Sequence, residues 1–238
     1  MLSVKLLGER CLHHAGEDIS GAIHYRKGWA LLGYLAVEKG RRHSREDLAR
    51  LLWPELPAAA ARTNLRQVVA DLNRAFDSRG AEDLLEVSRE SIGLFPASQV
   101  HVDLSVLDDP GWHVVDRPDA DSLIAAERRC ACLGGEFLAG FELDECSEFS
   151  EWLQMTRLRL AGLTAKTLQQ LCDAQEGAGW WPQAIATARR LALLDEWNES
   201  HQRRLMRLLA ANGQHQQALV VFEVLSASLC VELASEPE

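Results

Sequence analysis

Long apolar runs are missing from this chain of 238 residues. A helix needs roughly 18 or more consecutive apolar residues to cross a bilayer, so we expect no membrane-spanning segment. The N-terminal stretch MLSVKLLGER mixes charged and apolar side chains and lacks the long apolar core of a secretory signal peptide. The sequence therefore predicts a cytoplasmic protein that has no membrane partner.

The common catalytic and cofactor-binding signatures are also missing. The sequence contains no G-x-x-x-x-G-K-[ST] loop, no G-x-G-x-x-G after an expected strand, and neither H-E-x-x-H nor G-x-S-x-G. These absences remove the usual nucleotide sites, zinc-protease sites and serine-hydrolase sites. We therefore expect that the protein is not an enzyme and that it needs no cofactor.

The six cysteines do not follow a metal-binding pattern. Cys130, Cys132 and Cys146 lack both the Cys-x2-Cys spacing and the following histidine pair that zinc sites use. A chain without a signal peptide keeps its thiols reduced, so we expect structural cysteines and no bound metal.

The net charge of −10 is unevenly distributed. Residues 1–107 carry 14 basic and 14 acidic side chains, whereas residues 108–238 carry 11 basic and 21 acidic side chains. A uniformly acidic protein would repel nucleic acid, but a neutral N-terminal half has room for a basic face. The asymmetry favours two domains with different partners, the acidic one facing proteins.

The stretch from Ala58 to Arg79 is typical of one long amphipathic helix. Apolar side chains recur at three- and four-residue spacing, which places them on one face: Leu65, Val68, Val69, Leu72 and Phe76. The other face carries Thr63, Arg66, Gln67, Ala70 and Arg74, with Arg62 at its edge. Arginine and amide side chains match base edges and phosphates in the DNA major groove, although a solvated helix face would look similar.

The flanking sequence predicts small strands and two further helices. Short strands are expected at Val4–Leu7, at Arg10–His13 and at Ile19–Ile23, before a helix that begins at Tyr25 and ends near Glu38. A second helix starts after Ser44, an N-cap residue, and ends before Pro54. After residue 79, Leu84–Val87 and Ile92–Phe95 form an expected hairpin with Arg89 at its tip. Helix, helix and hairpin in this order indicate a winged helix-turn-helix.

The segment RKGWALLGYLAVEKGRRHSREDLARLLWPELPAAAARTNLRQVVADLNRAF resembles the winged-helix domain of the OmpR/PhoB type, as found in the Streptomyces antibiotic regulatory protein (SARP) family. His101-Val102-Asp103 resembles the strand that closes this domain. The resemblance implies that the third helix enters the major groove and that the wing touches the backbone. It places Thr63, Asn64, Arg66, Gln67, Ala70 and Arg74 on or beside the reading face. Asp71 departs from an often basic position, and Glu90 accompanies Arg89 in the wing; both weaken the electrostatic attraction to DNA.

Residues 108–238 predict a helical repeat domain. Helices are expected at 120–133, 146–176, 182–194, 199–212 and 215–230. Gly179 and Ala184 recur as Gly213 and Ala218, an offset of 34 residues that matches the tetratricopeptide period. The motifs "G-x-F-L-x-G-F", "W-L-x-x-x-R-x-R-L" and "R-x-L-M-R-L-L-A-x-x-G-x-x-x-x-A-L" resemble the bacterial transcriptional activator domain, which follows the winged helix in the SARP family.

The sequence thus predicts a mainly α protein, with a winged helix-turn-helix over residues 1–107 and an all-α tetratricopeptide-like domain over residues 108–238. We expect a transcriptional regulator whose 58–79 helix reads double-stranded DNA. Backbone contacts are expected from the remaining arginines: Arg41, Arg42, Arg45 and Arg89. The repeats would mediate self-association, RNA polymerase contact or coupling to a sensor. An alternative is a protein-interaction module whose winged helix is a scaffold that does not bind DNA.

Overall fold

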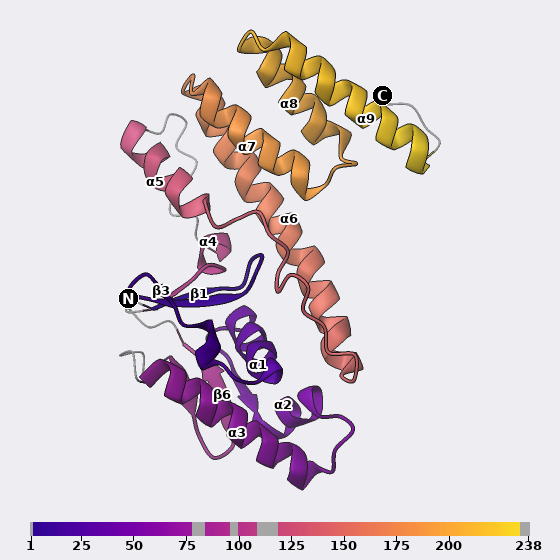
Figure 1. Cartoon of the computed structure of the whole chain (residues 1–238). Helices are drawn as coiled ribbons and strands as arrows, with labels where there is room; N and C mark the ends of the chain where they lie inside the picture. Colours follow the sequence, from indigo (N-terminus) through magenta and orange to yellow (C-terminus); the bar gives the residue numbers. More distant parts are fainter. Residues whose placement is uncertain (1, 78–83, 96–99, 109–118, 234–238) are drawn as a thin grey trace. The chain divides into compact units, whose positions relative to one another are not determined.

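A computed structural model describes residues 2–77, 84–95, 100–108 and 119–233 of the chain, and the remaining residues lie outside the description (Figure 1). The chain divides into two compact units. One consists of Met1–Ser105 with Gly135–Leu158, and the other of Val106–Gly134 with Arg159–Glu238. None of the helices in the described ranges combines the length and the hydropathy needed to cross a lipid bilayer.

Two small sheets frame the first unit. The first has the order β3-β2-β1-β7, in which β1 (Leu2–Lys5) pairs antiparallel with β2 (Cys11–His14) and parallel with β7 (Val100–Val102), and β3 is Glu17–Asp18. The second has the order β4-β6-β5, from Arg42–Ser44, Ser91–Leu94 and Leu85–Val87. β5 and β6 form the expected hairpin, and β7 is the expected closing strand.

The strand expected at Ile19–Ile23 is wrong, because Ser20–Ala22 forms a 3-10 turn, η1. Asp18 causes the turn: its Oδ1 accepts hydrogen bonds from the backbone N and the hydroxyl of Ser20, at 2.8 and 2.6 Å. Ser20 Oγ in turn accepts from the backbone N of Leu12 on β2. The aspartate and serine side chains therefore satisfy backbone and hydroxyl groups locally and replace a third strand.

Three helices build the core of the first unit. They are α1 (Arg26–Val37), α2 (Arg45–Leu52) and α3 (Ala58–Asp77), the last matching the expected long helix except for residues 78 and 79, which are outside the described residues. Ser44 caps α2 as expected, since its side chain accepts from the backbone N of Asp47 at 3.0 Å. The apolar face of α3 is buried, with Leu65 and Leu72 completely inaccessible.

Residues 135–158 pack with the N-terminal unit, although the sequence division at 107/108 assigns them to the C-terminal domain. Leu138 N donates to Leu6 O at 2.7 Å, and Gly8 N donates to Glu136 O at 2.8 Å. A Cβ on Gly135 would lie 2.4 Å from Gly8 Cα, so only glycine allows this approach.

Aromatic and arginine contacts complete that packing. The Trp152 ring lies 4.8 Å from the ring of Tyr34 on α1. Arg157 donates to the carbonyls of Phe137, Leu138 and Phe141 at 2.9, 2.7 and 3.1 Å. These bonds fix a segment without regular structure, whose carbonyls would otherwise lack donors.

The second unit contains the expected helical repeats. Beyond the short α4 (Ser105–Asp108), the helices are α5 (Ala120–Cys130), α6 (Ser147–Gly177, whose first part belongs to the other unit), α7 (Trp181–Leu194), α8 (Glu199–Ala211) and α9 (His215–Leu233). The two interhelical turns are equivalent. Gly179 and Gly213 both have φ of +76°, and each turn has a matching 2.8 Å backbone bond, Trp180 N to Gln175 O and Gln214 N to Leu209 O. The 34-residue period is therefore a repeated three-dimensional turn.

Arginines hold the helices of the second unit together. Arg204 and Arg207 on α8 pair with Glu176 on α6, at 3.3 and 2.5 Å. Arg190 on α7 donates to the carbonyls of Cys130 and Leu133, at the C-terminal end of α5. Positive side chains at a helix C-terminus satisfy carbonyls that have no helical partner.

Burial governs the thiols, and all six cysteines are free. Burial raises the pKa of Cys130 to about 12. It also raises the pKa of Cys146 and Cys172, whose Sγ–H groups donate to the carbonyls of Leu52 and Ala184. Thiols with raised pKa values are poor nucleophiles at neutral pH, which fits the structural role expected for these residues.

The repeated turn gives a stability prediction. Replacing Gly213 with Ala places a side chain at positive φ and should lower the free energy of unfolding by about 1–2 kcal/mol. Replacing Gly162 with Ala, inside α6 with no atom within 4 Å of the new Cβ, should instead raise it by roughly 0.5–1 kcal/mol. Urea unfolding followed by circular dichroism measures both, and an equal effect of the two substitutions would contradict the assigned turn.

Asp103 gives a pH prediction. Its Oδ2 accepts from the backbone N of Leu6 and of Leu7 at 2.8 Å each, and burial raises the pKa of this carboxyl. A raised folded-state pKa adds stability that is present below the ordinary aspartate pKa of about 3.9 and is lost as the pH rises through the folded value. Wild-type stability should therefore fall relative to Asp103→Asn as the pH increases above about 4. A difference in unfolding free energy that is constant or grows with pH would refute this.

Candidate nucleic-acid interface

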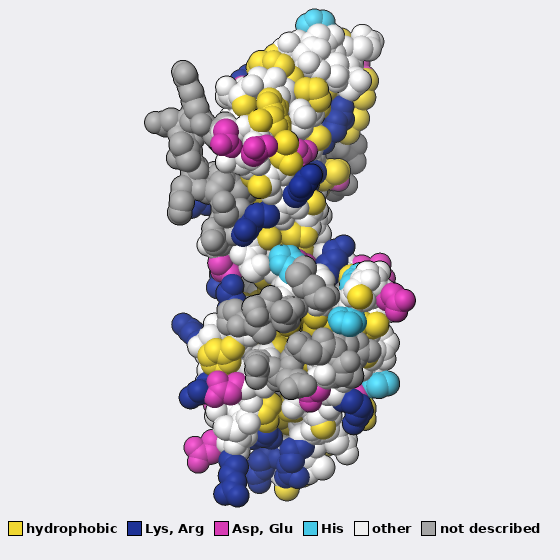
Figure 2. All heavy atoms as spheres, turned by 90° about the vertical axis from the view of Figure 1, so that its left-hand side faces the viewer, with side chains coloured by type: hydrophobic (Ala, Val, Ile, Leu, Met, Phe, Trp, Pro, Cys, Tyr) yellow, Lys and Arg dark blue, Asp and Glu magenta, His cyan; other side chains and the backbone are white. Residues whose placement is uncertain are grey.

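The exposed face of α3 carries the residues that the sequence predicts. Arg62, Thr63, Arg66, Gln67, Ala70 and Arg74 are exposed, and Asn64 is half-buried. The face is fixed by the burial of the opposite stripe, because α3 cannot turn without exposing its leucines to water. Figure 2 shows Lys and Arg side chains gathering at the lower end of this unit, at the level of α2 and α3.

A hollow of about 550 Å³ lies between α3 and the hairpin turn of β5 and β6, which we call the wing. Its lining brings together four of the predicted arginines with three smaller side chains: Arg45, Arg62, Arg66, Arg89, Leu65, Val87 and Ser88. Arg62, Arg66 and Arg89 form no ion pair with any side chain in the described ranges. Clustered guanidinium groups without carboxylates produce a positive potential that attracts anions.

The wing is held in place by Arg45 at the start of α2. Arg45 Nε donates to Ser88 O at 2.9 Å, and the backbone N of Arg45 donates to Glu90 O, also at 2.9 Å. Ser88 Oγ lies 3.0 Å from Ser91 Oγ and accepts from the backbone N of Ser91 across the turn. Arg45 thus positions the wing next to α3, while its side chain also lines the hollow.

Arg41 and Arg42 are not part of this group. Arg41 Nη1 lies 3.0 Å from Glu38 Oε2, one turn earlier. Arg42 pairs with Glu86 on β5, and its guanidinium lies 5.9 Å from the centre of the Phe95 ring. Both are exposed, but neither lines the hollow. Their positive charges are partly compensated within the unit.

Asp71 is a structural residue and not an exposed negative charge on the reading face. Its side chain is 5% exposed, and its two oxygens accept from the backbone N and from Nδ1 of His24, at 2.9 and 2.7 Å. The expectation that Asp71 weakens the attraction to DNA therefore loses much of its basis. Glu90 is exposed beside Arg89, as the sequence suggests.

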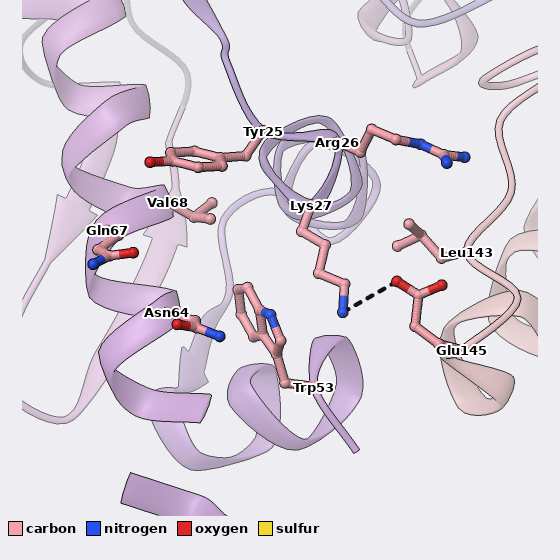
Figure 3. Close-up of a pocket in the computed structure, with 9 residues that line it drawn as sticks. All are labelled: Tyr25, Arg26, Lys27, Trp53, Asn64, Gln67, Val68, Leu143 and Glu145. Atoms are coloured by element: carbon pink, nitrogen blue, oxygen red, sulfur yellow. Dashed lines mark ion pairs between the residues drawn. The ribbon is translucent and has the colours of Figure 1, made fainter. Parts of the chain in front are cut away.

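A second hollow, of about 310 Å³, flanks α3 on the side of α1 (Figure 3). The residues that line it are Tyr25, Arg26, Lys27, Trp53, Asn64, Gln67, Val68, Leu143 and Glu145. Figure 3 shows Lys27 extending past the Trp53 ring toward Glu145, and its Nζ lies 3.3 Å from Glu145 Oε1. Sequence reasoning missed Tyr25, Arg26 and Lys27, because their proximity to Asn64 and Gln67 depends on how α1 packs against α3.

The described residues offer no alternative site built on a metal. Among them, no group of three or more His, Cys, Asp or Glu side chains is arranged to hold a metal ion. The arginine-lined hollow is therefore the site whose chemistry is most specific, and an anion of extended shape suits it.

Comparison with known proteins agrees with this architecture. The family model of the bacterial transcriptional activator domain matches residues 120–238. Among solved structures, the chain is similar to Mycobacterium tuberculosis EmbR in complex with a low affinity phosphopeptide, with a TM-score of 0.64 and 17% identity. That match covers 100% of this chain and 62% of the other, so this chain spans about three fifths of that one. The similarity at this identity shows a shared fold, a winged helix-turn-helix with a helical domain. No curated protein sequence matches the chain.

The contact between Arg45 and the wing gives a dynamic prediction. Arg45→Ala removes the side-chain bond to Ser88 O and should lower the free energy of local opening by about 1 kcal/mol, roughly a fivefold faster exchange. Amide hydrogen exchange at Ser88–Ser91 measures this. The matched control is Arg50→Ala, which removes the same charge from α2 but breaks a bond to Asp47. Equal exchange rates in the two variants would show that Arg45 does not hold the wing.

Proposed function

The chain belongs to the family of the bacterial transcriptional activator domain, as a SARP-type transcriptional regulator, and we propose that it acts by binding double-stranded DNA through its N-terminal unit. In this proposal α3 enters the major groove and the wing lies along the backbone. The observation that carries it is the group of arginines around the hollow between α3 and the wing. The whole chain is acidic, so a local positive surface requires that these side chains be kept away from carboxylates.

The arginines divide into two roles. Arg66 and Gln67 lie on the exposed face of α3, with Thr63, Ala70 and Arg74, and we assign them to base edges, because guanidinium and amide groups form paired hydrogen bonds with guanine and adenine. Arg62 and Arg89 are assigned to phosphates, with Arg45 positioning the wing. Asn64 completes the reading face at its half-buried edge. Arg41 and Arg42, which have carboxylate partners, make weaker backbone contacts in this arrangement.

The helical repeats are assigned to protein contacts, by self-association or with RNA polymerase. Exposed apolar side chains on α9 support this: Leu219, Val220, Phe222 and Val224 are about half exposed. Large apolar groups in a cluster on a protein surface mark interaction sites. The proposal gives the chain no catalytic step and places it in the cytoplasm, where a chromosome-binding regulator acts.

Salt dependence of DNA binding tests the proposal. The wild-type protein should bind a random-sequence duplex with an affinity that falls steeply as salt increases. Replacing Arg62 and Arg89 with Ala should reduce the slope of log affinity against log salt by about 0.9 for each phosphate that is no longer neutralised. The control is Arg128→Ala on α5, an exposed arginine in the other unit. Fluorescence anisotropy measures all three proteins.

Sequence preference is tested separately. Arg66→Ala with Gln67→Ala should remove the preference that selection from a random duplex pool reveals, at a cost of about 1–3 kcal/mol for each base that is no longer bound. Non-specific affinity should change much less. A wild-type protein that shows no salt-dependent binding would instead support the interaction-module alternative, in which the winged helix is a scaffold.

A further inference from the structure

One buried carboxylate on α3 organises two positive groups at the edge of the reading face. Asp71 Oδ1 lies 2.7 Å from His24 Nδ1 and 3.5 Å from Arg74 Nη1. Asp71 Oδ2 accepts from the backbone N of His24 at 2.9 Å. The Asp71 side chain is 5% exposed, whereas those of His24 and Arg74 are 62% and 72% exposed. A buried acid therefore presents an imidazole and a guanidinium together at the surface.

The hydrogen-bond pattern defines which atom of His24 is available. An ionised carboxylate only accepts hydrogen bonds, so the hydrogen in the contact with Asp71 belongs to Nδ1. Nε2 is then the ring nitrogen that can meet a ligand. Because Asp71 also binds the backbone N of the same residue, the ring is held from two sides and has little freedom to turn away.

The position of this pair on α3 is opposite to the arginine hollow. With 3.6 residues per turn, Gln67, Asp71 and Arg74 follow one another along one flank of the helix, while Arg62 and Arg66 follow the other flank. A helix in the major groove lies between two sugar-phosphate backbones. Arg62 and Arg66 supply donors toward one of them, so the second backbone requires donors on the flank of His24.

We propose that His24 and Arg74, positioned by Asp71, form a second phosphate-binding site for the DNA backbone on the α1 side of α3. This inference rests on the proposed function, because it needs a duplex held along α3. The ligand is a backbone phosphodiester, which accepts from His24 Nε2–H and from the Arg74 guanidinium at once. Charge-assisted contacts of this kind are stronger than contacts between neutral groups.

Such a contact couples DNA binding to proton uptake. Nδ1–H is already donated to Asp71, so donation from Nε2 requires the imidazolium form, which the Asp71 carboxylate stabilises. Histidine ordinarily changes its charge between about pH 5 and 8, so affinity should rise as the pH falls through this range. The other titratable or charged groups on the nearest elements are Arg74 on α3 and Tyr25, Arg26 and Lys27 after His24; η1 contributes none.

The test compares pH profiles of binding to a random-sequence duplex of roughly 25 base pairs at low salt. Wild-type affinity should increase several-fold from about pH 8 to about pH 6, within the tenfold per pH unit that one linked proton allows. His24→Gln should flatten this increase. Asp71→Asn should flatten it too, because an amide does not stabilise the imidazolium. His101→Gln, which changes an exposed histidine on β7, is the matched control and should keep the wild-type profile.

The outcomes separate this inference from the proposed function. A wild-type protein without salt-dependent binding overturns both. Salt-dependent binding with the same pH profile in wild type and His24→Gln overturns the second phosphate site alone. A merely structural role for the pair would lower affinity or melting temperature equally at every pH and would leave the profile unchanged. If Asp71→Asn does not fold, the exposed position of His24 still allows His24→Gln to decide.

Discussion

The burial of one face of α3 is the constraint on which the N-terminal unit depends. Leu65, Val68 and Leu72 are removed from water, and each such side chain contributes roughly 1.5–3 kcal/mol to folding. Rotation of α3 would forfeit this energy. Its arginines and amides consequently point outward without any contact that holds them there individually. The same apolar stripe that stabilises the unit thus determines which side chains a ligand can meet.

Electrostatics then distinguishes the arginines from one another. Arg42 has Glu86 as a partner and Arg41 has Glu38, so much of their charge is compensated inside the protein. Arg62, Arg66 and Arg89 line a common hollow and find no carboxylate among the described side chains. In a chain with a net charge of −10, this separation concentrates positive potential at the face where the family places DNA.

Periodicity made most of the fold predictable from the sequence. Helices α5 to α9 lie within a few residues of their expected bounds, and the Ser44 cap was readable from residue type alone. The strand β4 was not predicted, because the three polar residues Arg42–Ser44 carry no apolar alternation and pair only through their backbone with β6. The packing of residues 135–158 on the first unit was missed for a similar reason, since it depends on backbone bonds to β1 and the following residues.

The candidate site was predictable in its residues but not in their partners. The exposed face of α3 follows from helical spacing. The pairing of Arg42 with Glu86 spans 44 residues, and that of Asp71 with His24 spans 47, so no local pattern reveals them. Asp71 shows the consequence: by sequence it is a misplaced charge, whereas in the structure it is a buried acceptor that orders two donors.

The central claim is that the arginines between α3 and the wing receive the DNA. The most direct measurement is a titration of 15N-labelled protein with duplex DNA, following the arginine Nε–Hε signals. The account predicts that Arg62, Arg66 and Arg89 shift first and most, while Arg128 and Arg203 in the second unit remain unchanged. It would be contradicted if the signals of those three arginines stayed in place while the duplex bound elsewhere on the chain.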